Sequence, residues 1–162
     1  MSARLDHHVA LRVSDMSAAI RFWTEGAGGR LAMPPRRGSG GVFDLVFEPG
    51  CTVSMSYVLF DSGALELFCF EEPALPVPES RQAADAIMHF GITVPDVVAA
   101  LSRIEECGGR RRSPVLHMFG RKDFPRFVYC ESPDGHVFEF LETGAEGVVD
   151  LAARSTTDAP GG

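Results

Sequence analysis

The octapeptide HVALRVSD at residues 8–15 recurs as HFGITVPD at residues 89–96, and this pair of segments decides the fold. Histidine, an apolar fourth residue, valine and aspartate coincide in both copies, which are offset by 81 residues. In the first copy polar and apolar residues alternate as they do in a half-buried strand, and the aspartate is a typical helix cap or turn residue. Two copies of one supersecondary unit are the simplest explanation.

Each copy is followed by a stretch with an apolar helical face. The first includes Ala18, Ala19, Ile20, Phe22 and Trp23, and the second is VVAALSRIEEC at residues 97–107. Pairs of glycines, at residues 28–29 and 108–109, follow the two stretches at nearly the same distance, and glycine commonly ends helices. Each half is therefore predicted to begin with a strand, a turn and a helix.

The two halves also end alike, each with a predicted β-hairpin. Extended runs at residues 51–60 and 64–70 flank an Asp-Ser-Gly turn, and runs at residues 126–130 and 136–141 flank a Ser-Pro-Asp-Gly turn. The last strand of each half carries a single carboxylate in apolar surroundings, listed here with its strand: Glu66 in ALELFCF and Glu139 in HVFEFL.

These patterns predict an α+β protein with modules at residues 4–71 and 85–142. A proline-rich linker is expected at residues 72–84 and a frayed, polar tail at residues 143–162. Within the modules, PPRRGSGG at residues 34–41 is expected to be a loop, and the arginine run at residues 110–112 a solvated loop.

Composition narrows the classes of function. The 162 residues carry a net charge of -7, which disfavours nucleic acid and acidic membrane surfaces as partners. No apolar run is long enough to span a bilayer and the first thirty residues are unlike a signal peptide, so a cytoplasmic protein is expected. The four cysteines lack CxxC spacing, which indicates reduced, packed thiols.

Four ionisable residues lie in predicted strands at equivalent places of the repeat: His8, Glu66, His89 and Glu139. Such residues on an apolar face are costly to bury unless they are paired or bound to a metal. Taken singly, each is more commonly a hydrogen-bonded core or surface residue. If the halves pack about a pseudo-twofold axis, however, the four side chains converge into a nitrogen and oxygen ligand set that suits Zn, Ni, Co, Fe or Mn.

The other three histidines do not share this arrangement. His7 precedes the repeated position, while His117 and His136 lie in or beside predicted loops and are expected to face solvent.

The segments HVALRVSD, ALELF, HFGITVPD and SPDGHVFEF together resemble the vicinal oxygen chelate superfamily, which includes glyoxalases, bleomycin-resistance proteins and extradiol dioxygenases. The resemblance covers about residues 4–142. It implies two paired βαβββ modules that form an eight-stranded cup-like sheet around one divalent metal ion, usually in a homodimer. It also implies that His8, Glu66, His89 and Glu139 are the metal ligands.

Within the superfamily this ligand set is similar to that of glyoxalase I, a lyase that isomerises a glutathione hemithioacetal. The resemblance implies that Glu139 removes a proton beside a chelated carbonyl, giving an enediolate, and that Glu66 returns it. Arg12 matches a glutathione-contacting arginine. The glyoxalase I pattern has asparagine where this chain has Phe70. Together with Phe68, Phe70 makes the entrance of the expected substrate pocket aromatic, so the thiol that the substrate contains, glutathione or another, stays open.

Other branches of the superfamily remain as alternatives. Extradiol dioxygenases and fosfomycin-resistance transferases have histidine as the second ligand, and methylmalonyl-CoA epimerase has an additional acid that the strand at residues 51–60 lacks. The alternative from another class is a drug-sequestering protein without catalysis. Its ligand groove would draw on these aromatic residues: Phe68, Phe70, Trp23, Phe119, Phe124 and Tyr129. Arg121, Lys122 and Arg126 are candidates to bind a substrate carboxylate or phosphate.

Overall fold

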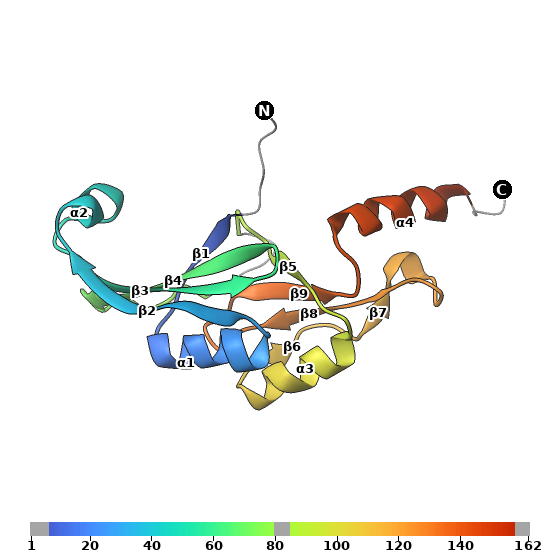
Figure 1. Cartoon of the computed structure of the whole chain (residues 1–162), viewed down its shortest axis with the longest axis horizontal. Coiled ribbons are helices and arrows are strands. Elements are labelled where there is room, and N and C mark those ends of the chain that lie inside the picture. Colours follow the sequence, from blue (N-terminus) through green and yellow to red (C-terminus); the bar gives the residue numbers. More distant parts are fainter. Residues whose placement is uncertain (1–6, 80–84, 158–162) are drawn as a thin grey trace. The chain divides into compact units, whose positions relative to one another are not determined.

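A computed structural model describes residues 7–79 and 85–157 of the chain. The chain divides into two compact units, one of Met1–Glu79 with Pro133–His136 and one of Ser80–Ser132 with Val137–Gly162. Each unit contains a mixed β-sheet with helices, which confirms the α+β class (Figure 1).

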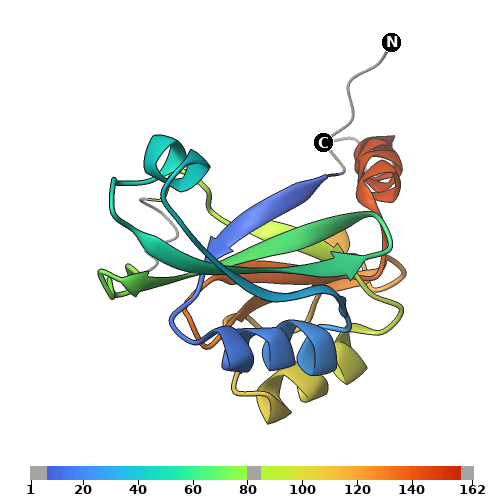
Figure 2. The same cartoon turned by 60° about the vertical axis from the view of Figure 1, so that its left-hand side comes forward.

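The first half is a four-stranded sheet in the order β1-β4-β3-β2, in which β1 runs parallel to β4 and the other pairs are antiparallel. Its elements are β1 (His8–Arg12), α1 (Met16–Arg21), a π-helical turn (Phe22–Gly26), β2 (Arg30–Ser39), α2 (Val42–Val46), β3 (Thr52–Phe60) and β4 (Gly63–Glu72). Helix α1 covers one face of this sheet (Figure 2), and Phe22 and Trp23, which follow α1 in the chain, are fully buried. The core of the first half therefore lies on the α1 side.

The second half has a five-stranded sheet in the order β5-β9-β8-β6, with β7 also paired to β8. Its elements are β5 (Phe90–Thr93), α3 (Val97–Glu106), β6 (Arg110–Arg111), β7 (Leu116–His117), a 3-10 turn (Met118–Gly120), β8 (Arg126–Glu131), β9 (Val137–Leu141) and α4 (Ala145–Thr157). Val97, Ala100 and Ile104 of α3 are fully buried, as the amphipathic pattern predicts.

The repeat in the sequence is a repeat in the structure. Strand β5 runs parallel to β9 as β1 does to β4. Asp15 accepts a hydrogen bond from the Ala18 amide at 2.9 Å, and Asp96 accepts one from the Val98 amide at 2.8 Å, so the repeated aspartate is a helix N-cap in both halves. After the helices Gly28 and Gly108 adopt φ of 88° and 87°, which glycine alone takes without strain.

One predicted loop is a strand. Residues 34–41 were expected to form a loop, but β2 runs through Ser39 and pairs with β3. Register shifts interrupt this pairing between Leu31 and Met33 and again between Met33 and Arg36. The second interruption contains Pro34 and Pro35. Because β2 is an edge strand, it can accommodate proline at such irregularities.

Two further expectations were wrong. Within the predicted frayed tail at residues 143–162, the helix α4 occupies Ala145–Thr157, and its Leu151 packs in a cluster with Met118 and Phe124, while residues 158–162 lie outside the described residues. The arginine run is also not simply a solvated loop: Arg110 lies in β6, and both Arg110 and Arg112 pair with the buried carboxylate of Glu131. Where a βαβββ module has a single strand after its helix, the second half has the two short strands β6 and β7, which both pair with β8.

The linker prediction is only partly covered. Residues 73–79 contain no helix or strand, while residues 80–84 lie outside the described residues. Among the helices that are described, none is long and apolar enough to cross a bilayer.

Candidate metal centre

In the first half, His8 and Glu66 form a close pair. The ring Nε2 of His8 lies 3.2 Å from Oε2 of Glu66, and the two side chains are 33% and 13% exposed. The pair arises from the parallel register of β1 and β4, in which Ala10 lies opposite Glu66 and His8 opposite Ala64. His8 and Glu66 thus occupy the same face of neighbouring strands, two residues apart in register.

The second half repeats this pair with His89 and Glu139. Here Nε2 lies 3.4 Å from Oε1, and the side chains are 27% and 17% exposed. His89 directly precedes β5, and Glu139 lies in β9 opposite Gly91, as Glu66 lies opposite Ala10 in the first half. Each half therefore contains one His–Glu pair, and the two pairs lie at equivalent register positions.

Each pair offers one imidazole nitrogen and one carboxylate oxygen, a donor combination that suits a divalent transition-metal ion. Within residues 7–79 and 85–157, no group of three or more His, Cys, Asp or Glu side chains is close enough to hold a metal. Each half thus supplies two candidate ligands, and the shared four-residue set remains a prediction.

His7 contacts the candidate ligand His8, although the sequence placed it outside the site. Their Nδ1 atoms lie 2.5 Å apart, so one ring donates a hydrogen bond to the other. His89 has no such support: its Nδ1 is buried and finds no hydrogen-bond partner among the described residues. In the sequence, the contact of His7 with His8 is indicated only by the position of His7 next to the repeated histidine.

A tyrosine accompanies each pair. Tyr57 faces Glu66 across β3 and β4, and burial, followed by a hydrogen bond to Glu66 and its negative charge, raises the pKa of Tyr57 to about 12. Tyr129 faces Glu139 across β8 and β9, and its pKa is also raised, by burial and then by the charge and hydrogen bond of Glu139. Sequence reasoning missed Tyr57 and assigned Tyr129 only to a possible aromatic groove.

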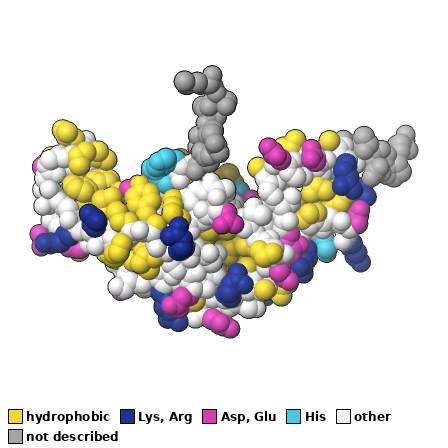
Figure 3. All heavy atoms as spheres, viewed as in Figure 1, with side chains coloured by type: hydrophobic (Ala, Val, Ile, Leu, Met, Phe, Trp, Pro, Cys, Tyr) yellow, Lys and Arg dark blue, Asp and Glu magenta, His cyan; other side chains and the backbone are white. Residues whose placement is uncertain are grey.

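The predicted substrate residues of the first half lie together. The Arg12 guanidinium lies 4.9 Å from the centre of the Phe70 ring, and its Nη2 is buried without a hydrogen-bond partner in the described part of the chain. Phe47, which the sequence analysis did not single out, lies just after α2 and packs edge-on against Phe68 and Phe70 at 5.3 and 5.2 Å. Figure 3 shows hydrophobic side chains gathered over α2 and the neighbouring strands.

Other aromatic candidates for a ligand groove are core residues. Trp23 is 1% exposed and Phe124 is 3% exposed, so neither can line an open groove. Phe119, by contrast, is 51% exposed.

The two remaining histidines were expected to face solvent, but both are part-buried. His117 is part-buried, with Nδ1 2.8 Å from the Phe124 carbonyl oxygen. His136 is part-buried with Nε2 2.7 Å from the Arg12 carbonyl oxygen, and burial lowers its pKa.

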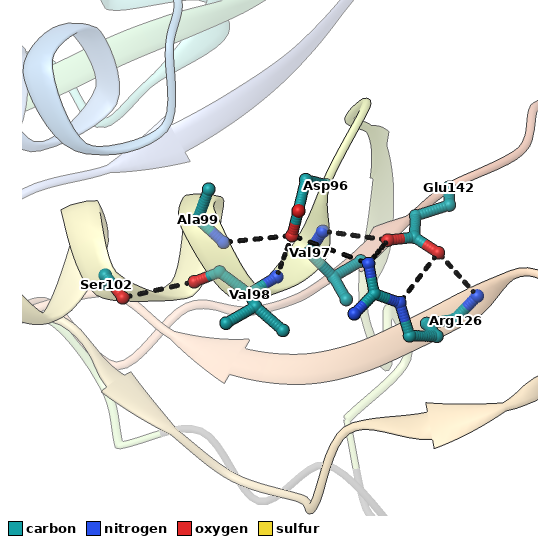
Figure 4. A network of polar contacts seen from close by, with 7 residues as sticks. All are labelled: Asp96, Val97, Val98, Ala99, Ser102, Arg126 and Glu142. Atoms are coloured by element: carbon teal, nitrogen blue, oxygen red, sulfur yellow. Dashed lines mark hydrogen bonds and ion pairs between the residues drawn. The ribbon is translucent and has the colours of Figure 1, made fainter.

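Arg126 is engaged in a structural network (Figure 4). Its Nη2 donates to Oε1 of Glu142 at 2.5 Å and lies 3.6 Å from Oδ1 of Asp96, the N-cap residue of α3. Arg121 likewise pairs with Asp123 at 3.1 Å. The two arginines therefore already have carboxylate partners within the chain, which weakens their candidacy as anion-binding residues.

The four cysteines are free thiols, in agreement with the sequence. Burial, with a smaller effect of the Glu105 charge, raises the pKa of Cys130 to about 12, so this thiol is protonated at neutral pH.

The chain belongs to the Glyoxalase/Bleomycin resistance protein/Dioxygenase superfamily, whose family model matches residues 6–140. A curated relative, the probable chloroplastic lactoylglutathione lyase of Arabidopsis thaliana, is 29% identical over 137 residues. That match covers 85% of this chain but 35% of the relative, so the chain spans about a third of its length.

Solved structures show the same fold at low identity. A glyoxalase family protein from Bacillus cereus has a TM-score of 0.73 at 19% identity, over 86% of this chain and 95% of that one. Glyoxalase I from Zea mays has a TM-score of 0.61 at 19% identity, over 85% and 44% of the two chains. The fosfomycin resistance protein FosX of Listeria monocytogenes, crystallised with Mn(II) and sulfate, has a TM-score of 0.57 at 16% identity, over 92% and 99%.

Proposed function

We propose that this protein is a divalent-metal-dependent lyase or isomerase of glyoxalase I type, with a small-molecule substrate. The observation that carries the proposal is the matched pair of His–Glu contacts, one in each half and each within 3.4 Å. Single surface ion pairs are common, but the same pair at equivalent register positions of two repeats is not expected from composition alone. The relation to a probable lactoylglutathione lyase supports the reaction class.

In this proposal His8, Glu66, His89 and Glu139 hold one ion among Zn, Ni, Co, Fe or Mn. A divalent ion bound there supplies Lewis-acid polarisation of a substrate carbonyl, which acidifies the neighbouring C–H. FosX, which shares the fold with this chain, was crystallised with manganese, one of these five metals.

The residues of the chain have separate roles in the proton transfer. Glu139 accepts the proton from the carbon beside the carbonyl and passes it by way of the substrate oxygens to Glu66, which returns it to the adjacent carbon, so that both carboxylates end as they began. Both carboxylates are more than four-fifths buried, which keeps competing water away from the proton being moved. Arg12, whose Nη2 lacks a partner among the described residues, binds an anionic group of the substrate, and Phe68 and Phe70 contact its apolar part.

Metal analysis tests this proposal against the binding-protein alternative, which the aromatic contacts of Phe47, Phe68 and Phe70 favour. We expect purified protein to retain one divalent ion per site after dialysis, and a His8→Ala, His89→Ala double variant to lose it. A double variant that binds the ion as tightly as wild type would overturn the metal site. Metal-free wild type that binds planar aromatic drugs tightly would favour sequestration.

The catalytic role is tested with Glu139→Gln in protein shown to retain its ion. Turnover is measured with methylglyoxal and a series of thiols, and separately by epimerisation of acyl-CoA substrates. We expect the variant to lose turnover, since an amide cannot accept the proton. Unchanged turnover would remove Glu139 from the role of base. The homodimer that the resemblance implies belongs to the same proposal, and light scattering measures it.

A further inference from the structure

Each His–Glu pair has a tyrosine at the equivalent place on the adjoining strand. In the β3–β4 hairpin Tyr57 is the register partner of Glu66, and in the β8–β9 hairpin Tyr129 is the register partner of Glu139. Residues directly opposite each other in an antiparallel pair share a face of the sheet, so each phenol and carboxylate lie side by side. The tyrosines lie outside the repeated octapeptides, so the two halves share more of the site than those segments alone show.

The tyrosine rings also contact the histidines. The ring centres of Tyr57 and His8 are 5.8 Å apart at an interplanar angle of 76°. Those of Tyr129 and His89 are 5.0 Å apart at 89°, the same edge-on arrangement. Two His–Glu–Tyr clusters result, defined as His8 with Glu66 and Tyr57, and His89 with Glu139 and Tyr129.

A carboxylate in this setting needs a hydrogen-bond donor. Glu66 and Glu139 are 13% and 17% exposed, and a partly buried carboxylate without donors is costly. The tyrosine hydroxyl can donate to one carboxylate oxygen and leave the other directed to the histidine side. Such a bond restricts rotation of the flexible glutamate side chain, whose terminal torsion is otherwise broad.

We propose that Tyr57 and Tyr129 are positioning residues for the metal centre: each holds the glutamate of its own half, by a phenol hydrogen bond, in the orientation that ion binding requires. This inference rests on the proposed function, because it takes Glu66 and Glu139 as ligands. It goes beyond the ligand set by assigning the hydroxyl groups that preorganise two of the ligands.

The test is the affinity of the protein for Zn²⁺, measured by competition with a chromophoric chelator. Tyr57→Phe and Tyr129→Phe keep the aromatic ring and its packing and remove only the hydroxyl. We expect each variant to bind zinc about tenfold more weakly, the lower end of the effect of losing a hydrogen-bond partner of a metal ligand. The visible spectrum of the Co²⁺-loaded protein should also change, because the ligand field depends on carboxylate orientation.

Matched controls come from the same strands and the same face. Met55 lies two residues before Tyr57 and faces Phe68, and Phe127 lies two residues before Tyr129 and faces Leu141. Met55→Leu and Phe127→Leu alter packing, the second beside the Tyr129 ring at 6.1 Å, but keep both tyrosine hydroxyls, so we expect unchanged zinc affinity and an unchanged cobalt spectrum. Thermal melting of the metal-free proteins verifies that all four variants fold.

The outcomes separate this inference from the proposed function. If Glu66→Ala and Glu139→Ala abolish zinc binding while both Tyr→Phe variants match wild type in affinity and spectrum, the positioning role is wrong and the metal centre stands. If the two glutamate variants bind zinc as wild type does, the metal centre itself is wrong and the inference with it. Weaker binding in the Tyr→Phe variants but not in the controls supports it.

Discussion

Gly91 lies directly opposite Glu139 in the parallel pairing of β5 with β9, and the missing side chain leaves room for the carboxylate. A Cβ added at Gly91 would lie 3.0 Å from a methyl group of Leu141 and 3.6 Å from Oε1 of Glu139. The first contact is with the end of a flexible side chain, whereas the second is with a candidate ligand. The size of the residue at position 91 should therefore affect the metal centre.

We expect Gly91→Val to weaken zinc binding and to lower the free energy of unfolding by roughly 1–3 kcal/mol, as overpacking usually does. The added methyl groups displace Glu139, while valine is itself favourable in a strand. Gly91→Ala is the control, since Leu141 can yield by a few tenths of an ångström. Zinc titration and urea denaturation measure both effects. Equal zinc affinity in Gly91→Val and wild type would show that Glu139 is not constrained from this side.

His7 should orient His8 through the contact between their Nδ1 atoms. If Nε2 of His8 binds the ion, Nδ1 of His8 carries the ring proton and donates a hydrogen bond to Nδ1 of His7. We expect His7→Ala to reduce zinc affinity about tenfold, with an unchanged melting temperature of the metal-free protein because His7 is exposed.

The control for His7 is His117→Ala. His117 bonds to the Phe124 carbonyl oxygen and pairs with no glutamate in the described part of the chain, so its loss should affect stability and leave zinc affinity unchanged. Equal effects of the two variants on zinc affinity would contradict a specific role of His7.

The sequence predicted the elements whose signals are local. The repeated Asp15 and Asp96 cap helices because a side-chain oxygen needs only the amides of the next turn. It did not predict β2, because Pro34 and Pro35 are tolerated only at an irregular edge strand and that context is tertiary. It missed α4 because the segment is mostly polar and contains Gly147, although Val148 and Leu151 are spaced as on one face of a helix and pack on the same cluster.

The candidate ligands and the residues that support them differ in how visible they are in the sequence. His8 and Glu66 were found because the repeat marks them twice, and their pairing is now observed. Tyr57 was missed because the strand register places it opposite Glu66, and a register is not visible in composition. The predicted turn at residues 61–63 did contain that register, since Phe60 pairs with Gly63 and the pairs count back from there to Tyr57 and Glu66.

Arg12 should control binding of anionic substrates. Its guanidinium stacks over Phe70 and its Nη2 has no hydrogen-bond partner in the described residues, so a carboxylate of the substrate can pair with it. We expect Arg12→Met to lower kcat/KM about tenfold or more for substrates with a carboxylate, mainly through KM, as expected for an interaction made equally in the ground and transition states.

Two comparisons check the assignment of Arg12. Arg36→Met removes an exposed arginine of β2 and should leave KM unchanged. A substrate without a carboxylate should be turned over equally by Arg12→Met and wild type. A uniform loss on both substrates would indicate that Arg12 supports the structure and does not bind the anionic group.

Glu142 should stabilise the second half in a pH-dependent manner. Its carboxylate accepts hydrogen bonds from the amides of Val97 and Arg126 and from the Arg126 guanidinium (Figure 4). Burial acts to raise the pKa of Glu142, but these bonds and the Arg126 charge outweigh it and hold the pKa below the ordinary 4.5. We expect Glu142→Gln to lower the free energy of unfolding by about 1–3 kcal/mol at pH 7.

The sign of the pH dependence follows from the lowered pKa. The folded state binds the Glu142 proton less readily than the unfolded state, so its stabilisation is complete above about pH 4.5 and is lost as the pH falls through the folded pKa. The difference in unfolding free energy between wild type and Glu142→Gln, measured in urea, should therefore shrink at acidic pH. Glu146→Gln, at an exposed position of α4, should show no such difference. A difference that stays constant down to the most acidic pH at which both proteins fold would show that the ionised carboxylate does not hold this network together.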